Sequence, residues 1–325
     1  MTTPIMITHG LTKTFKGRHS FLGETKPAIQ AVADINLSLL PGETLGIVGE
    51  SGCGKSTLAR MMIGLDKPSG GEIQFKNQSM LELRREQKHW LHRKIQFVFQ
   101  DPLSSLNPRK TIRQILEAPL KYLLGKNKAD RTVRVEELMQ LTNLPTEFLD
   151  RYPHELSGGQ CQRIGIARAL AAEPELIVFD EPVSALDVSV QAQILNLLRQ
   201  LKRKFDLTYV FISHDLAVVE SLCDKIAVMY LGRIVEYAPR DQLFEHPRHP
   251  YTRVLLSSVP IAGQKPMGRV PLTGELPNPA KPPRGCAFEP RCYKAGEQCK
   301  TDRPPLKFID QGRQVACFHP DDSDL

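Results

Sequence analysis

The sequence of 325 residues has no hydrophobic run long enough to cross a lipid bilayer. Residues 1–9 also lack the charged start and apolar run of a secretory signal. These two absences predict an intracellular protein that is soluble in water. Because 41% of its residues are hydrophobic, the chain can form one large domain and a smaller one.

A recognisable nucleic-acid-binding module is also absent, although the formal net charge is +7. The densest basic run contains Arg84, Arg85, Lys88, Arg93 and Lys94, without a repeated aromatic pattern. We interpret this run as the solvated face of a helix and expect no nucleic-acid partner. The positive charge permits contact with an anionic membrane surface.

A glycine-rich loop lies between an apolar strand at 44–48 and a helix at 56–64. Its residues are Gly49, Glu50, Ser51, Gly52, Cys53, Gly54, Lys55, Ser56 and Thr57. The spacing G-x-x-x-x-G-K-S is that of a phosphate-binding loop, in which backbone N–H groups and a helix N-terminus face the phosphates. Lys55 can neutralise phosphate charge, Ser56 can bind Mg²⁺ and Thr57 can add a phosphate contact. A chance glycine-rich turn would not explain the flanking strand and helix.

Alternation of apolar and polar residues predicts antiparallel strands at 5–9 and 32–40, each with one buried face. Phe15 follows the first strand, where its ring can stack on a nucleobase or simply pack against the protein. From 112 to 156 the pattern is helical, which indicates a helical insert in an α/β core. We expect breaks in this insert at Pro119, Gly125 and Pro145.

Ser157, Gly158, Gly159 and Gln160 open a predicted helix that continues to residue 171. Ser157 is a good N-cap, and the two glycines leave backbone N–H groups accessible to an anion. Alone, such a sequence is usually a helix cap. Beside the phosphate-binding loop, it is a second candidate phosphate site.

Gln100, Asp180, Glu181 and His214 each stand at the carboxyl end of a predicted buried strand. Ligands bind at that end of parallel strands. Asp180 and Gln100 can contribute oxygen atoms near Mg²⁺, Glu181 can act as a general base on water, and His214 can hydrogen-bond the γ-phosphate or that water. The alternatives are a capping role for the two carboxylates and a structural histidine.

These motifs occur in the order seen in the nucleotide-binding subunits of ABC transporters, which the chain resembles. The motifs are 49–56, Gln100, 156–160, 176–181, 184–187 and His214. The resemblance implies a P-loop NTPase fold of the α/β class, with a RecA-like core, an antiparallel β-subdomain and a helical insert at about 101–165. It also implies an ABC domain at 1–240 and a small, loop-rich extension with cysteines at 241–325.

The same resemblance implies a head-to-tail dimer that binds ATP and magnesium between its subunits. The phosphate-binding loop of one subunit and Ser157–Gln160 of the other would enclose one nucleotide. Gln100 would open a loop that senses the transmembrane partner, and Asp187 would communicate across the dimer. Lys55, Glu181 and His214 match the family's pattern, so the chain is expected to hydrolyse ATP.

The tail narrows the resemblance further. Residues 241–252 and 274–277 resemble the C-terminal extension of ATPases from bacterial peptide and nickel importers, above all the F-type subunit of dipeptide or oligopeptide importers. This implies a paralogous ATPase subunit in a heterodimer, two permease subunits and an external solute-binding protein. It places the chain on the cytoplasmic face of the inner membrane. Nickel or another small solute stays open as the cargo.

Four cysteines lie close together in the tail, whereas Cys53, Cys161 and Cys223 are scattered and expected to be buried. The four are Cys286, Cys292, Cys299 and Cys317, at C-x5-C-x6-C-x17-C spacing. Their thiolates can hold zinc or an iron–sulfur cluster, and disulfides are disfavoured in a reducing compartment. The spacing lacks a C-x2-C zinc knuckle and related ATPases carry a four-iron cluster, which together favour a 4Fe-4S cluster.

Two other functions compete with transport. A soluble ABC ATPase acting on nucleic acid or ribosomes would usually have tandem ATPase units or a long coiled coil, and the sequence has neither. A purely regulatory nucleotide-binding module would not need Glu181 and His214. We therefore expect an ATP-hydrolysing subunit that energises import of di- or oligopeptides.

Overall fold

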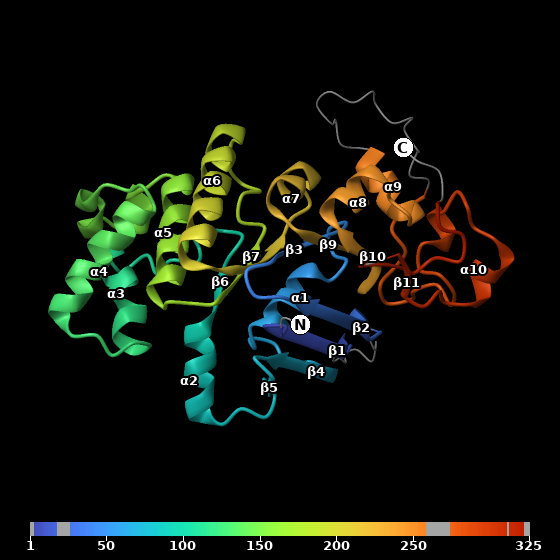
Figure 1. Ribbon diagram of the computed structural model, residues 1–325, viewed down its shortest axis with the longest axis horizontal. Coiled ribbons are helices and arrows are strands. Elements are labelled where there is room, and N and C mark those ends of the chain that lie inside the picture. The colour runs from blue at the N-terminus through green and yellow to red at the C-terminus, as the bar shows by residue number, and fades with distance from the viewer. Residues whose placement is uncertain (1–2, 18–26, 258–273, 311, 322–325) are drawn as a thin grey trace, which may run out of the picture. The chain divides into compact units, whose positions relative to one another are not determined.

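The computed structural model describes residues 3–17, 27–257, 274–310 and 312–321 (Figure 1). It contains two compact units. Unit 1 consists chiefly of Glu82–Ile212 together with Leu40–Thr44, and unit 2 of Ile5–Leu39, Leu45–Leu81 and the chain from Ser213 onward. Each unit is described separately. Within the described ranges, no helix is long and apolar enough to span a membrane.

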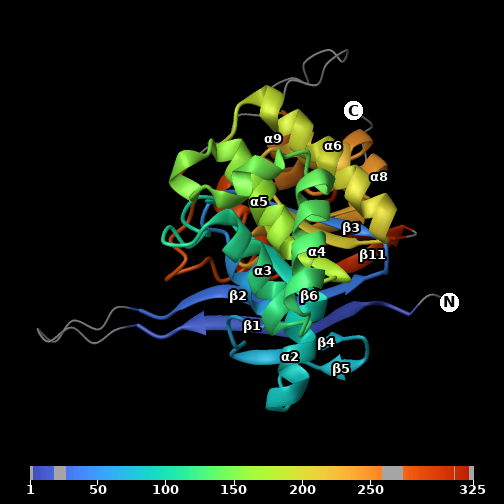
Figure 2. The ribbon, with the colours of Figure 1, turned by 90° about the vertical axis from the view of Figure 1, so that its left-hand side faces the viewer.

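Unit 2 contains an antiparallel sheet in the order β2-β1-β4-β5 (Figure 2). Its strands are β1 (Met6–Phe15), β2 (Ile29–Leu39), β4 (Gly70–Phe75) and β5 (Gln78–Ser79). Met6 pairs with Leu39 on one side and with Phe75 on the other, and all three side chains are buried. The expected antiparallel strands with one buried face are confirmed, since buried and exposed residues alternate along β2.

A second group of strands in unit 2 follows the order β11-β12-β10-β9-β3. Their bounds are β3 (Thr44–Val48), β9 (Lys225–Tyr230), β10 (Arg233–Pro239), β11 (Lys307–Asp310) and β12 (Arg313–Val315). β3 and β9 are parallel, whereas the other neighbours pair antiparallel. Every residue of β3 is buried, as expected for a strand that precedes a ligand loop.

Short helices complete unit 2. They are α1 (Lys55–Met62), α7 (Leu216–Leu222), α8 (Arg240–Glu245), α9 (Pro250–Ser257), η3 (Glu289–Arg291) and α10 (Glu297–Thr301). The buried side chains of α1 recur at helical spacing, with Leu58, Met61 and Met62 in the core. The tail around η3 and α10 is mostly irregular.

Unit 1 contains the parallel strands β6 (Ile95–Val98), β7 (Leu176–Asp180) and β8 (Thr208–Ile212). β7 and β8 are buried at every residue. The remaining elements are α2 (Arg85–Lys94), α3 (Ile112–Tyr122), α4 (Lys128–Leu141), η1 (Thr146–Asp150), η2 (Pro153–Glu155), α5 (Gly158–Ala171) and α6 (Val188–Phe205). Parallel strands place their carboxyl ends at one edge, which brings the residues that follow β6 and β7 together.

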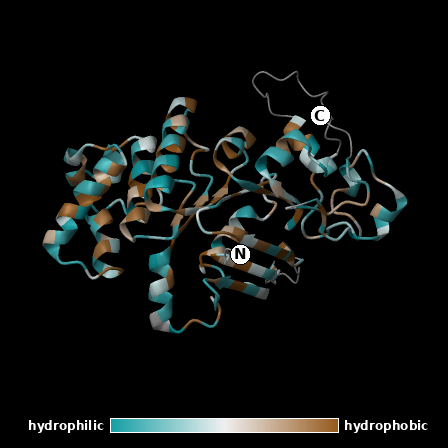
Figure 3. Cartoon of the chain, in the orientation of Figure 1, coloured by the Kyte–Doolittle hydropathy of each residue, from teal (hydrophilic) through white to brown (hydrophobic). Residues whose placement is uncertain are grey.

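Helices α3, α4 and α5 pack against one another as the helical insert (Figure 1). Their turns carry both hydrophobic and hydrophilic residues (Figure 3), and the hydrophobic ones, such as Leu116, Leu138 and Ile164, are buried. The expected break at Pro119 is wrong, because α3 continues through it to Tyr122. Pro119 removes only one hydrogen bond near the helix end, and the neighbouring Leu120 is fully buried.

Candidate functional site

The phosphate-binding loop of unit 2 begins directly after β3 and ends in α1. Two glycines have backbone angles and surroundings that exclude other residues. Gly49 has φ of 150°, and a Cβ there would lie 2.2 Å from the Met229 carbonyl oxygen. Gly54 has φ of 106°, and its Cβ would lie 2.0 Å from the Ala31 carbonyl oxygen. The loop conformation therefore depends on glycine at both positions.

Lys55 is folded back into this loop. Its Nζ donates to the carbonyl oxygens of Gly49, at 2.8 Å, and Glu50, at 3.0 Å. The side chain is only 5% exposed, so the loop holds the ammonium group in place. Gly54 caps α1 without a side-chain hydrogen bond, which leaves space for an anion at the helix N-terminus. Ser56 is exposed in the same turn and Thr57 is half-buried.

In unit 1, Gln100 and Glu181 lie together at the carboxyl ends of β6 and β7. The Gln100 Nε2 atom donates to the Glu181 carboxylate at 3.1 Å. Glu181 has a φ of 46°, unusual for a residue with a side chain, and its N–H donates to the Ile212 carbonyl oxygen at 3.0 Å. Asp180, the last residue of β7, is 8% exposed. Carboxylate and amide oxygens such as those of Asp180 and Gln100 are ligands that suit Mg²⁺. The positive φ of Glu181 is a backbone strain typical of functional sites.

The second candidate phosphate site opens α5 in unit 1. Ser157 and Gln160 form a reciprocal capping box: the Ser157 Oγ accepts from the Gln160 N–H at 3.3 Å, and the Gln160 Oε1 accepts from the Ser157 N–H at 2.9 Å. Ser157 and Gly158 are exposed. A Cβ on Gly159 would lie 2.7 Å from Val190 Cγ1, so this glycine allows α5 and α6 to approach closely.

Asp187 caps the helix that follows Ser184, Ala185 and Leu186. Its Oδ1 accepts from the Ser189 hydroxyl at 2.7 Å and from the Val190 N–H at 2.9 Å. These hydrogen bonds, led by that of Ser189, hold the pKa of the Asp187 carboxyl below its usual range. The residue is exposed and remains ionised.

Phe15 and His214 are both exposed side chains of unit 2. Phe15 ends β1, is 46% exposed and lies with its ring centroid 5.3 Å from the Lys13 Nζ. An exposed ring at this position can stack on a base. His214 follows β8 in the chain, between the buried Ser213 and Asp215, which caps α7.

The four tail cysteines line one small cavity together with His249, Phe288 and His319. The Cys286 N–H donates to the Cys299 carbonyl oxygen at 2.8 Å, which joins two of the cysteine-bearing segments. Burial raises the pKa of Cys292 to about 11 and that of Cys317 to about 12, so both thiols stay protonated in the protein alone. None of the seven cysteines is in a disulfide, and Cys53, Cys161 and Cys223 are buried as expected.

Among the residues described by the structure, no group of three or more histidine, cysteine or acidic side chains is arranged to hold a single metal ion. All four tail cysteines nevertheless line one cavity. Four cysteine sulfurs are the donor type that iron–sulfur clusters use, and a cluster would bind them as thiolates.

Comparison with known proteins agrees with these features. The model of the ABC transporter family matches residues 32–184, and that of the oligopeptide/dipeptide transporter C-terminal region matches residues 235–299. The dipeptide transport ATP-binding protein DppF of Haemophilus influenzae is 47% identical over 320 residues, which are 98% of each chain. The chain belongs to the ABC transporter ATP-binding proteins.

Other relatives of this ABC protein are similar over most of their length. The oligopeptide transport ATP-binding protein AppF of Bacillus subtilis is 51% identical over 293 residues, 89% of each chain. The dipeptide transport ATP-binding protein DppF of Escherichia coli is 48% identical over 294 residues, covering 90% of this chain and 88% of the relative. The resemblance inferred from the motifs is confirmed.

The ABC fold is also confirmed by solved structures. A dimeric post-hydrolysis state of the ATP-binding cassette MJ0796 with ADP and Pi has a TM-score of 0.65 and 32% identity, and the match covers 72% of this chain and 98% of that one. The cassette cbiO1 from Clostridium perfringens has a TM-score of 0.63 and 28% identity, covering 74% and 91%. Each match leaves a quarter or more of this ABC protein uncovered.

Two contacts to the phosphate-binding loop could not be predicted from the motifs. Arg291 donates to the Glu50 carboxylate, and the Tyr251 hydroxyl accepts from the Glu50 N–H. Both residues lie in the C-terminal part of the chain, more than 200 positions from Glu50. In the sequence, only the segment that contains Tyr251 pointed to a role, through its similarity to the C-terminal extension of peptide-importer ATPases.

Proposed function

We propose that this chain binds and hydrolyses ATP to energise the import of di- or oligopeptides by an ABC transporter. The observation that carries the proposal is the phosphate-binding loop, with Lys55 held inside it and two glycines that permit its shape. Peptide cargo is supported by the similarity of the chain, including its tail, to peptide-transport ATP-binding proteins over nearly its whole length. An ATPase subunit itself need not contact the cargo.

We assign the roles at the ATP site by residue type and position. Backbone N–H groups of the loop, Lys55 and Thr57 contact the phosphates, and Phe15 stacks on the base. Ser56, Gln100 and Asp180 supply oxygen atoms to Mg²⁺ or its water molecules, and the ion neutralises charge on the phosphates. Ser157, Gly158, Gly159 and Gln160 contact the nucleotide held by the opposing subunit.

Glu181 is the general base that orients and deprotonates the attacking water. Its hydrogen bond from Gln100 holds the carboxylate toward the strand ends of unit 1. His214 hydrogen-bonds the γ-phosphate or the water, and Asp187 communicates with the other subunit. The domain division at residue 240 also remains our proposal, with the tail from 241 as a separate functional segment.

The partners follow from the same function. Since the chain has one ATPase unit, it needs a second to enclose its nucleotides, and a paralogous subunit in a heterodimer fits an F-type chain. Two permeases would hold the pair at the cytoplasmic face of the inner membrane, and an external solute-binding protein would deliver the peptide.

We further propose that Cys286, Cys292, Cys299 and Cys317 hold an iron–sulfur cluster. Four cysteines lining one cavity support this, since a cluster links segments that bury little apolar surface. The cluster would cross-link the segments of the tail, either as a structural element or as one that responds to redox conditions.

One purification tests these proposals together. The transporter is isolated without oxygen from detergent-solubilised membranes, and its co-purifying chains, its visible spectrum and its peptide-stimulated ATPase rate are measured. Two permeases, a second ATPase and faster hydrolysis with peptide and binding protein are expected. Co-purification with ribosomes or DNA in place of permeases would refute the transport function, and a colourless, iron-free product would refute the cluster.

A further inference from the structure

Glu50, the second residue of the phosphate-binding loop, is held by three different groups. Its N–H donates to the Tyr251 hydroxyl at 2.9 Å. Its carbonyl oxygen accepts from Lys55 Nζ at 3.0 Å. Its carboxylate oxygens accept from Arg291 Nη1 at 3.1 and 3.0 Å. Two of these partners belong to the C-terminal part of the chain, so the tail contacts the backbone and the side chain of the same loop residue.

Arg291 lies immediately before Cys292 and is enclosed by the protein. Its side chain is 6% exposed and that of Glu50 is 25% exposed. The same Nη1 atom also donates to the Tyr230 hydroxyl at 3.2 Å, and the guanidinium lies 5.9 Å from the centre of the Tyr230 ring. An ion pair with so little exposure is not screened as a surface pair would be. The contact therefore constrains Glu50 strongly.

The aromatic side chains beside this pair form one cluster. The rings of Tyr230, Tyr251 and Phe288 lie 4.7 to 5.3 Å apart, centre to centre. All three are buried. Tyr230 ends β9, which pairs with the strand that leads into the loop, while Phe288 follows Cys286 by two positions. The cluster thus connects the base of the loop with the cysteine-bearing tail through rigid, close-packed rings.

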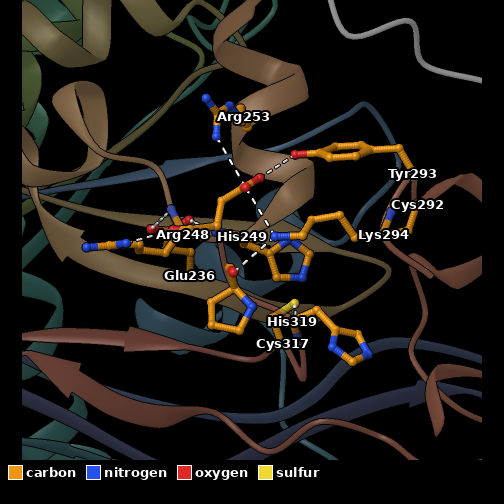
Figure 4. A network of polar contacts seen from close by, with 11 residues as sticks. Glu236, Arg248, His249, Arg253, Cys292, Tyr293, Lys294, Cys317 and His319 are labelled. Atoms are coloured by element: carbon orange, nitrogen blue, oxygen red, sulfur yellow. Dashed lines mark hydrogen bonds and ion pairs between the residues drawn. The ribbon is translucent and has the colours of Figure 1, made fainter. Parts of the chain in front are cut away.

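A second group of contacts joins the cysteine segment to the helix that carries Tyr251. The Asp321 carboxylate accepts hydrogen bonds from the Tyr293 hydroxyl and, at 3.1 Å, from Lys294 Nζ, and it pairs with Arg253 Nη1 at 3.3 Å. Figure 4 labels these three partner residues. Arg253 belongs to α9, two positions after Tyr251. The residues next to Cys292 and the helix with Tyr251 are therefore held by one carboxylate.

The start of α9 is fixed as well. The buried Glu236 carboxylate accepts from the Arg248 N–H at 3.0 Å and from the His249 N–H at 2.8 Å (Figure 4). His249 in turn accepts from the Tyr251 N–H at 3.0 Å through Nδ1. Tyr251 is thus positioned by β10 and by the tail before it meets Glu50.

We propose that the cysteine-bearing tail positions the phosphate-binding loop for ATP, through Arg291 and Tyr251 acting on Glu50. The proposal rests on nucleotide binding at this loop, which is part of the proposed function. Arg291 and Tyr251 are positioning residues, because they act through Glu50. Loss of the Arg291 or the Tyr251 contact to Glu50 would then weaken ATP binding at the loop.

The charges of Glu50 and Arg291 predict how loss of their ion pair would affect ATP binding. Glu50 places a carboxylate on a loop that must accept phosphate anions, and Arg291 compensates this charge. Without Arg291, the carboxylate would be left unpaired beside the polyphosphate and would compete for Lys55. Replacement of Arg291 therefore harms binding more when Glu50 is charged than when it is neutral.

The test measures ATP binding to the full-length chain by titration calorimetry, with EDTA present so that hydrolysis does not occur. Arg291→Met keeps most of the apolar volume and removes the charge. We expect it to weaken ATP binding about tenfold, as for a lost buried charge pair. In a Glu50→Gln background, Arg291→Met should weaken ATP binding about twofold or less. At saturating MgATP, the hydrolysis rate of the Arg291→Met transporter should stay within about twofold of the wild type.

Tyr251→Phe is a second variant that leaves the ring cluster intact and removes only the hydroxyl bonded to the Glu50 N–H. It should weaken ATP binding about fivefold, the effect of one neutral hydrogen bond. Two controls match these changes. Arg313→Met removes a buried tail arginine that bonds the carbonyl oxygens of His246 and Gln242, and Tyr209→Phe removes a buried hydroxyl bonded to the Leu198 carbonyl oxygen. Both controls should bind ATP like the wild type.

Unchanged ATP binding by folded Arg291→Met and Tyr251→Phe would overturn the inference. Equal weakening by Arg313→Met would also overturn it, because general destabilisation would then explain the effect. If Arg291→Met does not fold, ATP binding by the Tyr251→Phe variant tests the inference. A wild-type chain that binds ATP neither in EDTA nor with Mg²⁺ would refute the proposed function itself. Wild-type binding with insensitive variants would refute only the role of the tail.

Discussion

The amide nitrogen of Gln100 donates a 3.1 Å hydrogen bond to the Glu181 carboxylate. The two residues follow β6 and β7, parallel neighbours in unit 1, and are 81 positions apart in the sequence. Gln100 opens the loop that we expect to sense the transmembrane partner, and Glu181 is the proposed base that activates water. A shift of Gln100 would therefore directly change the orientation of the proposed base.

The first prediction concerns this base. Glu181→Gln should lower the ATP hydrolysis rate at least about 100-fold, because an amide cannot accept the proton from water. ATP binding should be retained, since the side-chain shape is unchanged. Phosphate release and nucleotide binding are measured on the assembled transporter, with Glu147→Gln, an exposed acid of η1, as the control. Wild-type hydrolysis by Glu181→Gln would remove the catalytic assignment.

The second prediction concerns the shape of the phosphate-binding loop. Gly54 and Gly125 both have positive φ, 106° and 64°, but only a Cβ on Gly54 would meet backbone, at 2.0 Å from the Ala31 oxygen. Gly125→Ala should lower the free energy of unfolding by about 1 kcal/mol, the cost of a left-handed alanine. Gly54→Ala should cost more and should also abolish ATP binding. Urea unfolding and calorimetry measure the two effects; equal costs for both variants would contradict the close approach.

The third prediction concerns stability in mild acid. Burial lowers the pKa of His249 from 6.5 to about 3. Between these two pH values His249 is therefore protonated in the unfolded chain and neutral in the folded chain. Stability that depends on neutral His249 is therefore complete above pH 6.5 and falls as the pH drops from there toward 3. Between pH 6 and 5 this histidine should contribute a loss of about 1 kcal/mol in the free energy of unfolding.

His249→Asn is the variant that isolates this effect, since asparagine can still accept the Tyr251 N–H at the start of α9. Its unfolding free energy should fall less steeply between pH 6 and 5 than that of the wild type. Glu236 and the other acids titrate in both proteins, so the difference in slope belongs to His249. Parallel slopes would show that His249 is protonated in the folded state.

The fourth prediction concerns the tail cysteines. Cys292→Ser should lower the iron and sulfide content of anaerobically purified protein by more than about half, because oxygen is a poor ligand for a cluster built on thiolates. Cys161→Ser, a buried cysteine of α5 in unit 1, should leave that content unchanged. An iron content that is the same in both variants, or zero in the wild type, would exclude the cluster.

The sequence by itself determined the local chemistry of this protein. The phosphate-binding loop, the Ser157 cap and the residues that end the buried strands could all be predicted. Each depends on residues within a few positions, since glycine torsions, helix caps and strand ends are local properties. The antiparallel strands at the N-terminus were predictable for the same reason, from alternation along a short segment.

Only the tertiary structure decided which distant residues meet. Glu50 and Arg291 are 241 positions apart, and no periodicity or motif links them; the packing of the Tyr230, Tyr251 and Phe288 rings brings them together. The same holds for four cysteines around one cavity and for Pro119, which stays inside α3 because burial of Leu116 and Leu120 outweighs one missing hydrogen bond. Long-range contacts of this kind depend on the fold of the whole chain.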